Sequence, residues 1–209
     1  MESCQVRGRF DSSKAHLNKR MLSDWFSAAL QPSRKCGRWA SKKMIIRKAK
    51  SSEFNIIADI HIESWRSAYS NVLPPKFLDT EIVPILKKQW GTVKIKNDDV
   101  VLVAEEKEII GFIAVWCRPI PFIDNLHVKP SHRSHNVGTA LMRATAEALL
   151  VKGHRTAYLW VFQSNEKAIR FYEKLGGVLK GSVMKDIFGR EVLSKKIEWD
   201  DLSTITMEN

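Results

Sequence analysis

Residues 122–142 read FIDNLHVKPSHRSHNVGTALM, and this stretch decides the fold. Its first part, through Val128, has the apolar and β-branched residues typical of a strand. Its last part opens a helix, because apolar residues continue at helical spacing as far as Val151, and Gly153 ends the pattern. A strand that bends directly into a helix N-terminus presents backbone N–H groups that have no partner within the helix. Such a junction is a candidate anion-binding site.

The junction has the composition that an anion site needs. Ser134, Asn136 and Gly138 are small or tolerate positive φ, so the backbone N–H groups of this bend can turn toward a single anion. Arg133 adds a positive charge and a forked set of donors. A loop that only caps the helix is the simpler alternative, and this stretch alone does not exclude it.

Other kinds of site are not indicated here. His127, His132 and His135 have no acidic or cysteine partner at metal-ligand spacing, so we expect solvated loop histidines and no metal. The three-glycine dinucleotide pattern and the P-loop pattern are both absent.

Outward from the junction, the patterns predict an alternation of strands and helices. Ser51 and Ser52 are predicted N-caps of a first helix that ends before residues 71–75, and Pro84 should kink or split a second helical stretch. The clearest predicted strands are 44–49, 100–106, 108–117, 121–128, 156–162 and 190–199. The predicted order is β-α-α-β-β-β-α-β-α-β-β, one mixed sheet with helices against it.

Composition supports one globular domain preceded by a basic tail. The chain has 209 residues, of which 44% are hydrophobic and 27% charged. Residues 1–43 hold 10 Lys and Arg against 3 Asp and Glu, whereas residues 44–209 hold 24 against 20. We expect the Ser-rich tail to be poorly ordered. The interpretation we favour is that the tail lies upstream of a true start at Met44. A transit peptide and a basic arm that binds an acidic partner are the alternatives.

The cysteines and the hydropathy bear on location. Cys4, Cys36 and Cys117 are widely spaced, which indicates neither a disulfide framework nor a zinc site and fits a reducing cytoplasm. No apolar run reaches the roughly 20 residues that cross a bilayer, so we expect no membrane association.

With these elements in place, two motifs resemble those of the GNAT-type N-acetyltransferases. The family's acetyl-coenzyme A motif is a strand, then Arg/Gln-x-x-Gly-x-Gly/Ala, then a helix, and residues 122–142 match it with Asn136 in place of the first glycine. A second motif, Asn-x-x-Ala-x-x-Phe-Tyr-x-x-x-Gly, is complete at residues 165–176. The resemblance covers about residues 44–200 and includes an acceptor-side helix pair at residues 61–79.

The resemblance implies a fold and a reaction. The fold is α/β (α+β), with a mixed, mostly antiparallel central sheet flanked by helices, in a domain of residues 44–209. The reaction is direct transfer of an acetyl group from acetyl-CoA to a primary amine in a ternary complex, with no metal. The implied CoA-binding residues are Leu126, Val128, Arg133, Ser134, His135, Asn136, Val137, Gly138, Thr139 and Asn165.

The resemblance also suggests three catalytic residues. The backbone N–H of Leu126 would stabilise the oxyanion, and Tyr172 would protonate the CoA thiolate, a suitable role for a phenol with a pKa near 10. The general base is chosen among Asp124, His127 and Glu63. Strand alternation places Asp124 on the face of Leu126 and His127 on the opposite face, and we favour Asp124.

The acceptor and two competing functions stay open at this point. Trp65, Tyr69, Trp116 and Phe122 suggest an aromatic acceptor site for a small-molecule or peptide amine, which leaves a lysine, a polyamine and a drug-like amine open. A homodimer is also left open. The replacement of glycine by Asn136 raises the alternative of a non-catalytic acyl-CoA sensor. Nucleic-acid binding rests on the pI of 9.7 and the tail alone, and it ranks lower.

Overall fold

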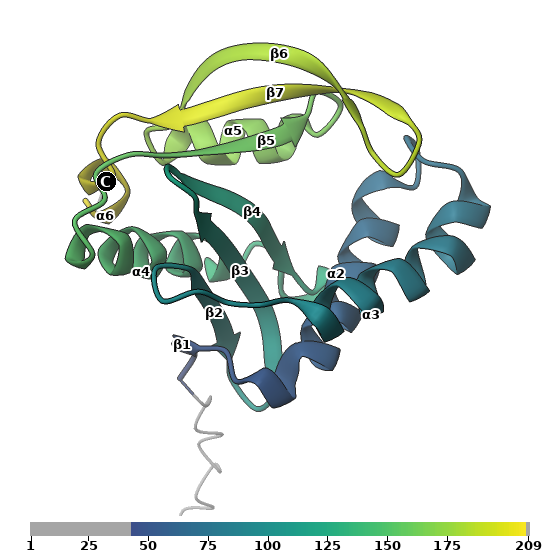
Figure 1. The fold of residues 1–209 in the computed structure, drawn as a ribbon, viewed down its shortest axis with the longest axis horizontal. Coiled ribbons are helices and arrows are strands. Elements are labelled where there is room, and N and C mark those ends of the chain that lie inside the picture. Colours follow the sequence, from purple (N-terminus) through teal and green to yellow (C-terminus); the bar gives the residue numbers. More distant parts are fainter. Residues whose placement is uncertain (1–42, 208–209) are drawn as a thin grey trace, which may run out of the picture. The chain divides into compact units, whose positions relative to one another are not determined.

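The computed structural model describes residues 43–207, in which seven strands form one sheet of order β1-β2-β3-β4-β5-β7-β6 (Figure 1). The strands are β1 (Ile45–Lys48), β2 (Val100–Glu105), β3 (Ile109–Cys117), β4 (Pro121–Val128), β5 (Ala157–Phe162), β6 (Val178–Asp186) and β7 (Glu191–Trp199). The helices are η1 (Ser51–Glu53), α2 (Phe54–Tyr69), η2 (Phe77–Glu81), α3 (Ile82–Thr92), η3 (Pro130–His132), α4 (Val137–Val151), α5 (Glu166–Lys174) and α6 (Ser203–Thr206).

The predicted fold class is confirmed. Every neighbouring pair of strands is antiparallel except β4 and β5, which are parallel. A parallel pair requires a crossover, and α4 supplies it. The element order is the predicted one, with the short helix α6 added after β7.

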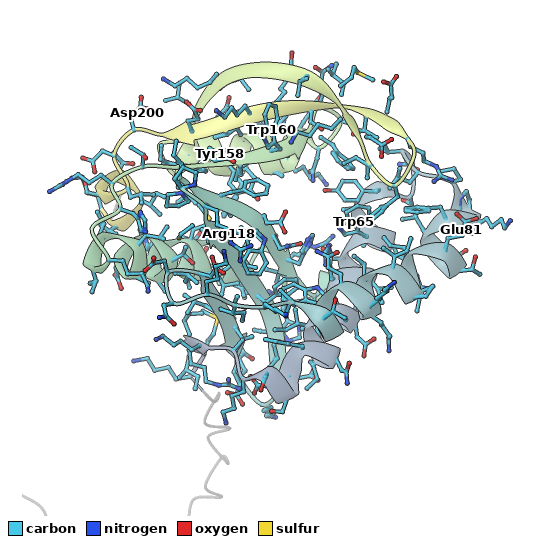
Figure 2. The ribbon with its side chains drawn as sticks, viewed as in Figure 1. Trp65, Glu81, Arg118, Tyr158, Trp160 and Asp200 are labelled. Carbon is cyan, nitrogen blue, oxygen red and sulfur yellow. The ribbon has the colours of Figure 1, made fainter. Side chains whose placement is uncertain are left out.

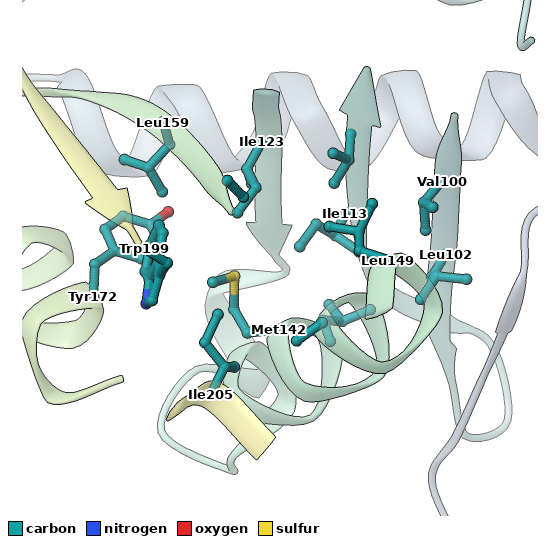
Figure 3. Packing of buried hydrophobic residues seen from close by; sticks show 14 of the residues in the cluster. Val100, Leu102, Ile113, Ile123, Met142, Leu149, Leu159, Tyr172, Trp199 and Ile205 are labelled. Carbon is teal, nitrogen blue, oxygen red and sulfur yellow. The ribbon is translucent and has the colours of Figure 1, made fainter. Parts of the chain in front are cut away.

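Helix α4 packs on one face of the sheet because its apolar residues form a continuous stripe. Leu141 and Met142 are almost fully buried, and Figure 3 shows Leu149 beside Ile113 of β3 and Leu102 of β2, with Met142 near Ile205 of α6. Burying each such side chain contributes about 1.5–3 kcal/mol. This packing holds the N-terminus of α4 at the end of β4, where the junction lies.

Helix α2 covers the opposite face of the sheet. Its residues Ile57, Ala58 and Ile60 pack with Phe112 of β3 and Trp90 of α3 in a second buried cluster. The two faces of the sheet are therefore covered by different helices within the described chain.

Two local predictions need correction. The expected kink or split at Pro84 is replaced by a change of helix type one turn earlier: the π-helix η2 runs directly into α3, and Pro84 is the third residue of α3. The predicted caps Ser51 and Ser52 are wrong. Both lie inside the 3₁₀ turn η1, and neither the start of η1 nor that of α2 has a side-chain cap from them. The turn is instead held by Glu53, which accepts from the backbone N–H of Lys50.

The predictions about residues 1–43 fall almost wholly outside the described residues. Among residues 43–207, none of the helices combines the length and the apolar character required to span a bilayer. Strand β1 begins at Ile45.

Candidate active site

Strands β4 and β5 separate soon after they meet. They pair only at Phe122 with Tyr158 and Ile123 with Leu159, and beyond these positions they diverge in Figure 1. A β-bulge in β4 accompanies the separation, because the register with β3 passes from Asn125 directly to Ile123 and leaves Asp124 without a partner. A bulge bends its strand, so residues 124–128 have an edge that no neighbouring strand covers.

The backbone groups of Leu126 and Val128 point toward this open edge. The N–H of Lys129 donates to the carbonyl oxygen of Ile110 on β3, at 2.8 Å. In an antiparallel pair, the backbone groups of successive residues alternate between the two edges of a strand. Because the N–H of Lys129 points toward β3, the N–H groups of Val128 and Leu126 point away from β3.

The separation of the strands opens a cleft of about 1320 Å³. Its walls come from α2, β4, the β4–α4 junction, β5, the start of α5 and the β6–β7 hairpin. The predicted residues that line it are Asp124, Leu126, Val128, Arg133, Ser134, Asn136, Val137, Gly138, Thr139, Asn165 and Tyr172. His135 is exposed and is absent from the walls.

The junction has free backbone donors. Ser134 and Asn136 have positive φ, 67° and 59°, as their small or αL-tolerant side chains suggested. Within residues 43–207, the N–H groups from Ser134 to Thr139 donate to no protein acceptor, and the first occupied N–H is that of Ala140, which donates to Asn136. Six consecutive donors at a helix N-terminus are suited to an anion with several oxygens.

Gly138 has a different reason to be small. Its φ is not positive, because it lies in the first turn of α4. A Cβ at this position would lie 3.3 Å from Cζ of Phe171 on α5. Gly138 therefore permits the close approach of α4 and α5, and positive φ is not the reason for a glycine at this position.

The Arg133 side chain points away from the free amides. Its Nη1 donates to Oγ of Ser67 at 2.8 Å, and its Nη2 donates to Oγ of Ser64 at 3.2 Å. Both serines belong to α2, so the guanidinium fastens the junction to that helix. Burial lowers the pKa of Arg133. The predicted forked donor set for an anion is thus used within the protein.

The second motif is built around α5. Asn165 caps this helix, with its Oδ1 accepting from the N–H of Ala168 at 3.2 Å. Seven residues later, Tyr172 is buried and its ring meets those of Phe171 and Trp199 edge to face. Burial, together with the nearby phenol of Tyr69, raises the pKa of Tyr172 above its usual value, so this phenol stays protonated at neutral pH.

Asp124 occupies the bulge. Its Oδ2 accepts from Nε1 of Trp116 and from Nδ2 of Asn125, both at 2.8 Å. Trp116 packs on the α2 side of the sheet, so the bulge interrupts alternation and Asp124 does not share the face of Leu126. That predicted placement is wrong. The carboxyl tip reaches solvent in the cleft, yet protein surrounds it on most sides, and this burial raises the pKa of Asp124.

His127 is not the solvated loop residue that the sequence suggested. It stacks on His61 of α2, with ring centres 4.3 Å apart, and its Nδ1 lies 3.0 Å from Oγ of Ser64. His61 in turn accepts through Nδ1 from Nε1 of Trp90, at 3.2 Å. Burial lowers the pKa of His61 to about 3. Burial also lowers the pKa of His127, and the neighbouring His61 and Arg133 act in the same direction. Both imidazoles are therefore neutral at pH 7.

Sequence reasoning missed His61 and Ser64. The available signal was that two polar residues three positions apart share a face of α2 with the apolar Ile57 and Ile60. The third base candidate, Glu63, is exposed and does not line the cleft. No group of three or more His, Cys, Asp or Glu side chains in the described part of the chain is arranged to hold a metal ion.

The tip of the β6–β7 hairpin borders the cleft above Trp65 (Figure 2). Phe188 and Gly189 both have positive φ, 52° and 79°, which is the conformation of a type I′ turn. Phe188 is an unusual residue there. Its ring packs near Trp65, at 6.0 Å, and near Phe77, at 5.8 Å, and these contacts hold the hairpin against α2 and η2.

Comparison with known proteins identifies the family. A family model described as the acetyltransferase (GNAT) family matches residues 55–177, a span that contains both motifs and most of the cleft. The chain belongs to the GNAT acetyltransferase family. It is therefore an acyltransferase, and acetyl transfer is its general reaction.

Individual relatives agree with this assignment. The Bacillus subtilis (strain 168) protein named uncharacterized N-acetyltransferase YuaI is 24% identical over 170 residues, 77% of this chain and 95% of that protein. The PaiA N-acetyltransferase of Thermoplasma acidophilum, solved with coenzyme A, has a TM-score of 0.54 and 19% identity over 73% of this chain and 98% of its own. A GCN5-related N-acetyltransferase of Rhodopseudomonas palustris has a TM-score of 0.61 and 18% identity, over 78% and 98%. The two structures support the fold.

Proposed function

We propose that this GNAT enzyme moves the acetyl group of acetyl-CoA directly to a primary amine while both substrates are bound. The observation that supports this most is the row of six free N–H groups from Ser134 to Thr139, next to the uncovered edge of β4. A diphosphate bound to the six N–H groups would use donors that the protein leaves unpaired, and so would a pantetheine chain bound along the edge of β4.

The described residues fit this substrate. Asn136 already has φ of 59°, so the replacement of the motif's first glycine does not close the bend. The backbone groups of Leu126 and Val128 would bind the pantetheine amides, and the N–H of Leu126 would stabilise the oxyanion of acyl transfer. Acetyl-CoA supplies an activated acetyl group as a thioester.

Proton transfer is assigned to two side chains. Tyr172 would protonate the leaving thiolate, because this phenol lines the cleft and carries its proton at neutral pH. Asp124 would receive the proton of the amine, because a raised carboxyl pKa makes a better base near neutrality and because this carboxyl opens into the cleft. His127 is a weaker candidate, since its lowered pKa makes it a poor proton acceptor.

The test is calorimetric titration of the full chain with acetyl-CoA, beside a thiol-release assay over a panel of peptide N-terminal, lysine, polyamine and drug-like amines. Saturable binding and release with at least one amine are expected. Binding without release for any amine would favour the non-catalytic acyl-CoA sensor. No binding at all would overturn the proposal, since the free amides would then have another purpose.

A further inference from the structure

The cleft contains an amine that belongs to the protein itself. Lys185 lies near the end of β6, the edge strand, and is half-buried, in contrast to the mostly exposed residues of that strand. Its Nζ lies 4.2 Å from the centre of the Trp160 ring on β5, a cation–π contact. Figure 2 shows Trp160 next to the β6–β7 hairpin. Lys185, Trp160 and Asp124 all line the same cleft.

Asp124 is arranged to take a proton from such an amine. Both of its hydrogen bonds, from Trp116 and from Asn125, go to Oδ2. Its Oδ1 accepts from no group within residues 43–207 and is left for a ligand in the cleft. Lys185 and Asp124 interact electrostatically across this space, so the carboxylate attracts the ammonium toward the proposed position of the base.

The burial of Lys185 also favours its reactive form. An ammonium cannot attack a thioester until it loses a proton, and an ordinary lysine has a pKa near 10.4. Burial lowers the pKa of Lys185, although Asp124 acts in the opposite direction. Burial therefore favours the neutral amine, against the Asp124 carboxylate and the Trp160 ring, which both favour the ammonium.

We propose that Lys185 is acetylated by its own active site, within one molecule. This inference rests on the proposed function. The lone pair of Nζ forms a C–N bond with the acetyl carbon, the C–S bond breaks and its electron pair leaves on sulfur. The proton lost by Nζ passes to Asp124, and the thiolate gains a proton from Tyr172. The proton on Asp124 then returns to the Tyr172 phenolate through solvent, which restores both side chains. The products are N-acetyllysine at position 185 and free coenzyme A, and no further reactant is needed.

Neighbouring lysines provide matched comparisons. Lys180 lies on the same strand but is exposed, is ion-paired with Asp200 at 3.1 Å and does not line the cleft. Lys167 also lines the cleft, from the first turn of α5, whereas Lys185 is the lysine that lies over the Trp160 ring. If acetylation requires a position in the cleft, Lys185 should be acetylated faster than Lys180. If it also requires Asp124 nearby, Lys185 should be acetylated faster than Lys167.

The experiment is incubation of the full chain with acetyl-CoA and no added amine, followed by peptide mass spectrometry over time. We expect one added acetyl group, on Lys185, at least about tenfold faster than on Lys180, since the cleft holds both reactants together. The fraction modified per unit time should not depend on protein concentration. Lys185→Arg, which keeps the cation over Trp160, should abolish the modification, whereas Lys180→Arg should leave it unchanged. Asp124→Asn should slow it at least about tenfold.

Each other outcome contradicts the inference. A rate that rises with protein concentration would mean transfer between molecules. Equal labelling of Lys185, Lys180 and Lys167, or labelling that persists after heat denaturation, would mean uncatalysed acetylation. Calorimetric binding of acetyl-CoA and turnover of added amines without modification of Lys185 would overturn self-acetylation and leave the proposed function standing. Absence of acetyl-CoA binding would instead remove the proposed function.

Discussion

At the scale of single residues, the two small positions of the junction have separate duties. Asn136 takes the left-handed conformation that opens the bend, and Gly138 leaves room for Phe171. A motif written as two glycines thus combines a backbone requirement with a packing requirement. Asparagine can meet the first because it tolerates positive φ, but a larger side chain cannot meet the second.

Gly138→Glu should abolish measurable acetyl-CoA binding. Its Cβ would meet Phe171 at 3.3 Å, and its carboxylate would stand among the N–H donors intended for an anion. We expect the affinity in calorimetry to fall at least about a hundredfold, or ~2.7 kcal/mol, with an unchanged far-UV circular dichroism spectrum. The control is Gly91→Ala in α3, where a Cβ meets nothing within 4 Å. Unaltered affinity in the Glu variant would remove the junction from CoA binding.

Tyr172→Phe should reduce turnover far more than binding. The ring contacts with Phe171 and Trp199 survive this change, and only the phenol proton is lost. Loss of a general acid costs about 10²–10⁴-fold in rate. The measurements are kcat by thiol release and Kd by calorimetry. Tyr158→Phe is the control, since Tyr158 stacks on Phe122 and does not line the cleft. An unchanged kcat in the Tyr172 variant would require a different proton donor.

At the scale of elements, the sequence predicts regular structure better than its interruptions. The bounds predicted for β4 and α4 agree with the structure, because each has a continuous periodic pattern. The β-bulge at Asp124 left no sign in that pattern, so the face assigned to this residue was wrong. The stacking of His61 on His127 depends on the contact of α2 with β4, which local spacing does not contain.

The cap of α5 provides a test that separates folding from binding. Asn165→Ala should lower the free energy of unfolding by about 1 kcal/mol in urea denaturation, because the N–H of Ala168 loses its acceptor. Asn165→Asp keeps a capping oxygen and should keep the stability. If the Asp variant nonetheless binds acetyl-CoA more weakly, the amide acts beyond the cap, either on the substrate or through its hydrogen bond with Tyr69. Wild-type stability in the Ala variant would show that the cap contributes nothing.

At the scale of the whole molecule, two buried histidines join helix α2 to strand β4. His61 comes from α2 and His127 from β4, and Ser64 connects them to Arg133 in the junction. Helix α2 is thereby fixed to the loop that carries the free amides. Protonation of either imidazole would place a charge in this interface, so the stability of the domain should report on their titration.

Acid should destabilise the protein from about pH 6.5 downward. Burial holds the pKa of His61 at about 3, against an ordinary 6.5. Between these values the unfolded chain binds a proton that the folded chain does not, so the free energy of unfolding falls as the pH falls, by ~1.4 kcal/mol per pH unit for one histidine. His127, whose pKa is also lowered, adds in the same direction. Glu53, with a pKa lowered to about 2 by its hydrogen bond with Arg47, adds a further loss only below about pH 4.5.

Urea denaturation at a series of pH values from 8 to 4.5 measures this slope before Glu53 contributes. His61→Gln removes one titrating group while its side-chain oxygen can still accept from Nε1 of Trp90, the bond that the imidazole makes at 3.2 Å. The variant should be less stable at pH 8, because it loses the stack on His127, yet its stability should decline more gently toward pH 4.5. An identical slope in both proteins would mean that His61 titrates normally and that the interface between α2 and β4 admits water.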